Sequence, residues 1–120
     1  MMKVISLLLI ILITSYSSSI SAQTNNLKAA NTISSSDLNE PCPGKYYELY
    51  LLSDTEEQFG TAVMKLFFLV DKGFITRAAN SGINASDWGY RVGKTFQRYC
   101  ESSSIVTVRT AVKQTISELE

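Results

Sequence analysis

The chain contains no histidine, and this absence removes a large part of catalytic chemistry. Without an imidazole there is no histidine general base, no Ser–His or Cys–His nucleophile and no histidine metal ligand. Glu56 and Glu57 do not form a catalytic carboxylate pair in place of histidine, because adjacent residues of a helix do not face one another. Glycine-rich phosphate loops, EF-hand patterns and nucleophile elbows are also missing. We therefore expect a protein that is not an enzyme and that needs no cofactor or metal.

An excess of charge of one sign is missing as well. The sequence holds 11 Lys and Arg against 11 Asp and Glu, so its formal net charge is zero. Proteins that bind nucleic acid usually carry a basic excess. We expect a protein partner and no nucleic acid.

The first 22 residues show the three-part pattern of a secretory signal peptide. A positive start at Lys3 precedes an apolar run at residues 4–13, and small residues then lead to Ala22. The run is shorter than the roughly 20 apolar residues that span a bilayer, although an uncleaved anchor is the alternative. We expect cleavage, export to the periplasm or beyond, and no membrane contact afterwards.

Cysteine is scarce too, since Cys42 and Cys100 are the only two. Export brings both into an oxidising compartment, and no CxxC spacing supports a redox motif. One intramolecular disulfide is therefore favoured over two free thiols or a redox site. A domain of this size benefits from such a cross-link because its core is small.

Hydrophobic periodicity predicts helices and no strand after a flexible polar leader at residues 23–40. The predicted helices cover residues 45–52, 55–79, 84–100 and 105–119. In the second and longest of these, apolar residues recur at spacings of three and four: Phe59, Val63, Phe67, Val70 and Phe74. The pattern indicates an all-α, four-helix domain at residues 41–120.

A basic stripe lies opposite the apolar face of the third predicted helix. Arg91, Lys94 and Arg98 recur at spacings of three and four, which places them on one side of that helix. The stripe is either an ordinary solvated face or a docking surface for an acidic protein.

From Pro41 to Leu119 this arrangement resembles the HdeA/HdeB family of bacterial periplasmic acid-stress chaperones. The resemblance rests on Cys42 at the start of the fold and on Asp71-Lys72-Gly73-Phe74-Ile75 in the long aromatic helix. It rests further on an amphipathic helix that ends at Cys100 and on a polar break before Val108 and Ala111. It implies a small HdeA-like helical domain with a single Cys42–Cys100 disulfide.

The resemblance implies a fold more than a function. Immunity proteins that neutralise secreted type VI toxins have the same kind of domain. The acid chaperones tend to end in a lysine-rich tail, whereas this chain ends Ile116-Ser117-Glu118-Leu119-Glu120.

The first functional hypothesis is an acid-activated holdase chaperone. Below about pH 3 most carboxylates take up protons, and the remaining positive charge loosens the fold. The apolar residues of the second helix would then bind unfolded periplasmic clients: Phe59, Val63, Phe67, Val70 and Phe74. The alternative interpretation of these five residues is an ordinary core.

The second hypothesis is an immunity or inhibitor protein that binds a secreted toxin through its folded surface. Arg91, Lys94 and Arg98 would then meet acidic groups on the toxin. A homodimer is a third alternative, in which Leu66 and Phe68 would bury the seam between two copies. The alternative interpretation is that these two residues face the fourth predicted helix.

Overall fold

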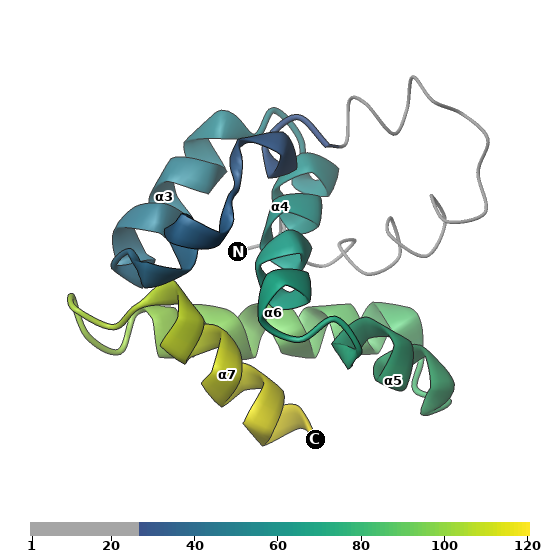
Figure 1. The fold of residues 1–120 in the computed structure, drawn as a ribbon. Helices are drawn as coiled ribbons and strands as arrows, with labels where there is room; N and C mark the ends of the chain where they lie inside the picture. The colour runs from purple at the N-terminus through teal and green to yellow at the C-terminus, as the bar shows by residue number, and fades with distance from the viewer. Residues whose placement is uncertain (1–26) are drawn as a thin grey trace.

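The computed structural model describes residues 27–120, which form five α-helices after two short 3₁₀ helices (Figure 1). In chain order the elements are η1 (Ala30–Thr32), η2 (Ser35–Asn39), α3 (Cys42–Leu52), α4 (Glu56–Val70), α5 (Phe74–Asn80), α6 (Ala85–Cys100) and α7 (Val108–Leu119). Across residues 27–120 there is no strand, and Pro41 and Thr107 form an isolated β-bridge. The all-α prediction is confirmed, while the predicted signal peptide at residues 1–22 lies outside the described residues.

The predicted second helix, residues 55–79, is interrupted, so five α-helices replace the expected four. α4 ends at Val70, and the next residue, Asp71, has an extended backbone (φ −148°, ψ 97°). The Asp71 carboxylate accepts a hydrogen bond from the backbone N–H of Gly73 at 3.1 Å, which stabilises the turn. The Phe74 ring still packs on Phe67, with centroids 5.5 Å apart. The apolar spacing therefore continues across the break and conceals it in the sequence.

Residues 27–40 belong to the folded domain, which corrects the expectation of a flexible leader at residues 23–40. Their apolar side chains enter the core, where Ala29, Ala30, Ile33 and Leu38 are buried. Lys65 Nζ also donates a hydrogen bond of 3.0 Å to the carbonyl oxygen of Ala30. These few apolar residues stand among serines and asparagines without a helical period, so the sequence pattern resembles a linker. Residues 23–26 lie outside the described residues.

An aromatic row runs through the core and joins α3, α4, α5 and α6. Its neighbours, with centroid distances, are Tyr46–Phe59 (5.2 Å), Tyr46–Phe96 (6.0 Å), Phe96–Phe67 (5.4 Å), Phe67–Phe74 (5.5 Å) and Phe74–Trp88 (5.0 Å). α7 packs mainly on α6 and α4 but adds only aliphatic or small buried side chains. These are Val108, Ala111, Val112, Thr115 and Ile116.

The predicted disulfide between Cys42 and Cys100 is present and links residues 58 positions apart in the chain. It joins the start of α3 to the end of α6, with the two Cα atoms 5.2 Å apart. Beside it, the Cys42 N–H donates to the carbonyl of Val106 (2.6 Å), and the Val108 N–H donates to the carbonyl of Glu40 (3.0 Å). The first turn of α7 is therefore fixed next to the disulfide.

Candidate functional site

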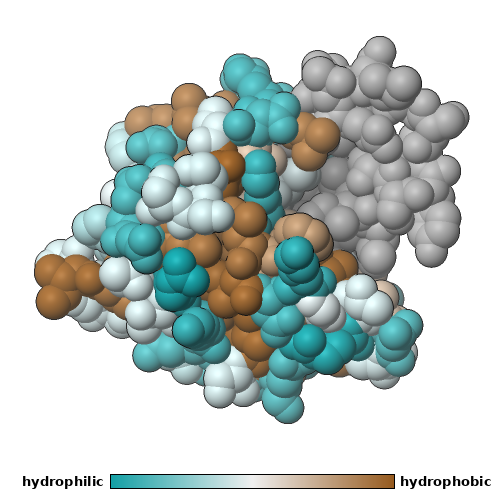
Figure 2. Space-filling model, viewed as in Figure 1, coloured by the Kyte–Doolittle hydropathy of each residue, from teal (hydrophilic) through white to brown (hydrophobic). Residues whose placement is uncertain are grey.

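The five client-binding candidates lie in the core of this structure. Phe59, Val63, Phe67 and Phe74 are at most 1% exposed, and Val70 is partly buried. Figure 2 shows an apolar band at the surface over α4 and toward α7, bordered by hydrophilic residues. Phe68, one candidate for a dimer seam, is 46% exposed, whereas Leu66 is buried. Client binding through the five candidates therefore requires the fold to open.

The basic stripe on α6 is partly engaged by neighbouring side chains. Arg98 Nη2 donates to both carboxylate oxygens of Glu118 at 2.7 and 2.6 Å, and its guanidinium lies 4.7 Å from the centroid of the Tyr99 ring. Lys94 Nζ lies 5.9 Å from the centroid of the Tyr90 ring. Arg91 is exposed and contributes to lowering the pKa of Glu118 after hydrogen bonds from Tyr99 and Arg98. The three cations thus lie on one face of α6, but Arg98 is already paired with Glu118 of α7.

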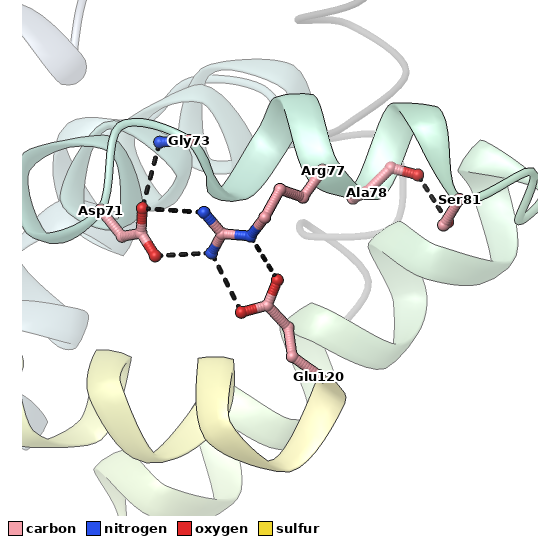
Figure 3. Close-up of polar contacts among 6 residues, drawn as sticks. All are labelled: Asp71, Gly73, Arg77, Ala78, Ser81 and Glu120. Atoms are coloured by element: carbon pink, nitrogen blue, oxygen red, sulfur yellow. Dashed lines mark hydrogen bonds and ion pairs between the residues drawn. The ribbon is translucent and has the colours of Figure 1, made fainter.

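Arg77 holds the far end of α7 to α5 (Figure 3). Its Nη2 donates to Asp71 Oδ2 at 2.6 Å and to Glu120 Oε1 at 3.0 Å. Its Nε donates to Glu120 Oε2 at 2.6 Å. One guanidinium on α5 therefore connects the turn after α4 with the residue that follows α7.

Glu118 provides a second attachment, between α7 and α6. Besides Arg98, the hydroxyl of Tyr99 donates to Glu118 Oε1 at 2.6 Å. We call the two groups, Asp71–Arg77–Glu120 and Arg98–Tyr99–Glu118, the α7 clamp. Its charged side chains are between 33% and 58% exposed, so protons and water reach them.

The α7 clamp depends on ionised carboxylates. A hydrogen bond from Arg77 lowers the pKa of Asp71, and hydrogen bonds from Tyr99 and Arg98 lower the pKa of Glu118. A carboxyl whose pKa is lower in the folded state stabilises that state above its unfolded pKa, and this stabilisation disappears as the pH falls through the folded pKa. The clamp therefore weakens below about pH 4.

A third, more buried group of charges surrounds Lys45, which is only 6% exposed. Its Nζ lies 3.0 Å from Asp37 Oδ1, 2.9 Å from Glu48 Oε2 and 3.5 Å from Glu40 Oε1. Burial alone would raise the pKa of Asp37, but hydrogen bonds from the Ser34 N–H and from Lys45 outweigh it and lower that pKa. Protonation in acid would leave the Lys45 charge buried without an anion, which is unfavourable.

The structure offers no alternative site of metal chemistry in the part of the chain that it describes. Within residues 27–120, no three His, Cys, Asp or Glu side chains are grouped to hold a metal ion. Within the same residues, none of the helices is both long and apolar enough to cross a membrane. The disulfide fits an exported protein, because such bonds persist in oxidising compartments.

Comparisons with family models, with curated proteins and with solved structures found no match to this chain. The resemblance to the HdeA/HdeB family therefore stays a prediction from the residues quoted for it.

Sequence reasoning missed the α7 clamp. Its partners are 43 positions apart for Arg77 and Glu120 and 20 positions apart for Arg98 and Glu118. No local pattern connects such residues. The one available signal in the sequence is the pair of acidic residues Glu118 and Glu120.

Proposed function

We propose that this protein is an exported, acid-responsive holdase that is folded at neutral pH and binds unfolded proteins in acid. The α7 clamp is the single observation that carries this proposal. Each ion pair described at the far end of α7 uses an accessible carboxylate, and acid neutralises carboxylates. In acid, that end of the helix separates from α5 and α6 and uncovers apolar surface.

The two ends of α7 differ in a way that suits reversible opening. Its first turn is fixed by backbone hydrogen bonds next to the disulfide, and these do not titrate. Its last turn depends on the clamp and on aliphatic packing. We therefore expect α7 to swing about residues 106–108 rather than to unfold with the rest of the chain.

Charge repulsion adds to the loss of the clamp. Below about pH 3 the 11 Asp and Glu become largely neutral while Lys and Arg keep their charges. Arg77, Arg98 and Lys45 then lose the anions that face them. The disulfide and the aromatic row limit how far the other four helices separate, so that apolar surface becomes available without complete unfolding.

The direct test is aggregation of an acid-denatured client protein, measured by light scattering with and without this protein. We expect suppression below about pH 3 and none at neutral pH. Absence of suppression in acid would contradict the proposal. So would suppression by a protein whose apolar-dye binding and α7 amide exchange do not change with pH.

A double variant, Glu118→Gln with Glu120→Gln, isolates the clamp. It should bind an apolar dye and suppress aggregation at a higher pH than the wild type, because both anions are absent at every pH. Asp54→Asn is the matched control, since it removes an ion pair of 2.6 Å between exposed side chains, Lys28 and Asp54, away from α7. If both variants respond at the same pH, the clamp does not control opening.

The alternative function, toxin neutralisation through the folded basic stripe, has less support. Arg98 is already paired with Glu118, so Arg91 and Lys94 remain as the cations of the stripe that would bind an acidic partner. Charge reversal at these two residues would weaken such binding at neutral pH. The same change should leave the acid-dependent holdase activity in place.

A further inference from the structure

A surface cavity of about 350 Å³ lies where the disulfide joins the start of α3 to the end of α6. Its lining contains three tyrosines, one carboxylate and no basic side chain: Pro43, Tyr46, Tyr47, Tyr50, Gln97 and Glu101. We propose that this tyrosine cavity binds a small organic cation of the alkylammonium class. This binding is separate from the holdase function, because it belongs to the closed fold at neutral pH.

The composition of the lining selects for positive charge. The faces of tyrosine rings attract cations, and quaternary ammonium ligands are commonly held by several aromatic rings. Glu101 and Gln97 stand at the C-terminal end of the 16-residue helix α6, where the helix dipole also favours a cation. Pro43, which also lines the cavity, has no N–H to offer an anion. The Glu101 carboxylate would repel an anionic ligand, and a neutral ligand would gain less binding free energy than a cation.

The negative charge of Glu101 acts on Tyr46, one of the residues that line the cavity. After the larger effect of burial, the Glu101 carboxylate raises the pKa of Tyr46. Elsewhere on α6 the same chain already places cations over tyrosines, with Lys94 over Tyr90 and Arg98 over Tyr99.

Two of the three tyrosines are held in position by the core before any ligand arrives. Tyr46 and Tyr50 both pack edge-to-face on Phe59, with centroids 5.2 and 5.7 Å apart. Pro43 follows Cys42 and Glu101 follows Cys100, so the disulfide fixes the two walls relative to each other. A site formed in advance loses little conformational entropy on binding. Its volume is at the lower end of small-molecule sites, roughly 300–1,000 Å³, which favours a free solute over a polypeptide segment.

The test is an NMR titration of the oxidised protein at neutral pH with choline and with 3,3-dimethylbutan-1-ol, its uncharged isostere. Choline should shift the signals of Tyr47 and Gln97 in a saturable way, with affinity about tenfold higher than that of the isostere. Equal affinity of the two compounds, or no saturable shift, would overturn the proposal. Tighter binding of an N-acetyl-lysine amide than of choline would overturn the assignment to a free solute.

Two variants locate the site. Glu101→Gln removes the carboxylate and Tyr47→Leu removes the aromatic ring of a residue that is 63% exposed, so both variants should fold normally. Each should weaken choline binding about fivefold. Glu56→Gln and Tyr90→Leu are matched controls on exposed residues outside the lining and should leave binding unchanged. Unchanged affinity in both lining variants would refute the cavity as the site.

Discussion

The helices α3 to α6 share an aromatic row and a disulfide, whereas α7 is attached through aliphatic contacts and ionised carboxylates. Aromatic packing and a disulfide do not depend on protonation, but the α7 clamp does. Acid therefore acts mainly on one helix of the domain. This difference allows apolar surface to be exposed while the remaining helices stay together.

Lys45 and its three carboxylates lie between these two regions. They join η2 to α3, and η2 packs against α7. Loss of the Asp37 charge in acid therefore weakens a second neighbour of α7. The acid response should spread from α7 to η2 before it reaches the aromatic row.

The largest expected effect comes from removing the disulfide. Cys42→Ser with Cys100→Ser should lower the free energy of unfolding by about 4 kcal/mol, because the bond closes a loop over 58 positions. It should also make all five α-helices open together in acid. Urea unfolding at neutral pH measures the first effect, and near-ultraviolet circular dichroism during acid titration measures the second. If α7 still opens alone, the aromatic row is sufficient to hold the other helices.

A smaller effect is expected from Val112→Ala, which removes two buried carbons from α7. The loss of packing should cost about 2 kcal/mol and should accelerate amide exchange selectively in α7. Val63→Ala is the matched control in α4, where the same truncation also occurs at a buried site. It should affect exchange throughout α3 to α6. If the two variants give the same exchange pattern, α7 does not open independently.

The sequence was sufficient to predict features that depend on the local spacing of residues or on a single pair of cysteines. Apolar periodicity predicted the helical class, and the presence of only two cysteines predicted their bond. The break at Asp71 was missed because the spacing from Phe67 to Phe74 fits a continuous helix. The folded role of Ile33 and Leu38 was missed because each is isolated among polar residues.

The sequence did not predict the α7 clamp, for a different reason. Its contacts depend on where α5, α6 and the end of α7 meet in space, and surface ion pairs leave no periodic pattern. The tyrosines of α3 were visible in the sequence, but their cavity exists only because the disulfide brings Glu101 beside them.

A third prediction concerns pH. The pKa values of Asp37, Asp71 and Glu118 are lowered in the folded protein, so stability should be constant above about pH 5 and fall below about pH 4. The free energy of unfolding of the Glu118→Gln variant should be lower than that of the wild type at neutral pH, and it should change less with pH. The two stability curves should converge as the pH falls through the lowered folded pKa of Glu118, because below that pKa Glu118 is protonated in both the folded and the unfolded state. Urea midpoints across this pH range are the measurement, and parallel curves would contradict the role of Glu118.

The smallest effect is expected from Gly73→Ala, which disturbs the clamp without removing any of its charges. An added Cβ would lie 2.8 Å from Arg77 Nη1, so the guanidinium must shift away from the new methyl group. The Nη1–Oδ1 contact, already 3.3 Å long, should be lost while the bonds to Glu120 remain. Because the end of a long side chain moves easily, the free energy of unfolding should change by less than about 0.5 kcal/mol.

Gly44→Ala is the matched control for this substitution, because nothing lies within 4 Å of its added Cβ. Gly73→Ala should raise the pH at which α7 amides begin to exchange rapidly, and Gly44→Ala should not. A shift in Gly73→Ala as large as that of the Glu118→Gln, Glu120→Gln variant would mean that the position of Arg77 matters as much as the two anions. No shift would mean that the Nη1–Oδ1 contact takes no part in retaining α7 and that the bonds from Nη2 to Asp71 and Glu120 are sufficient.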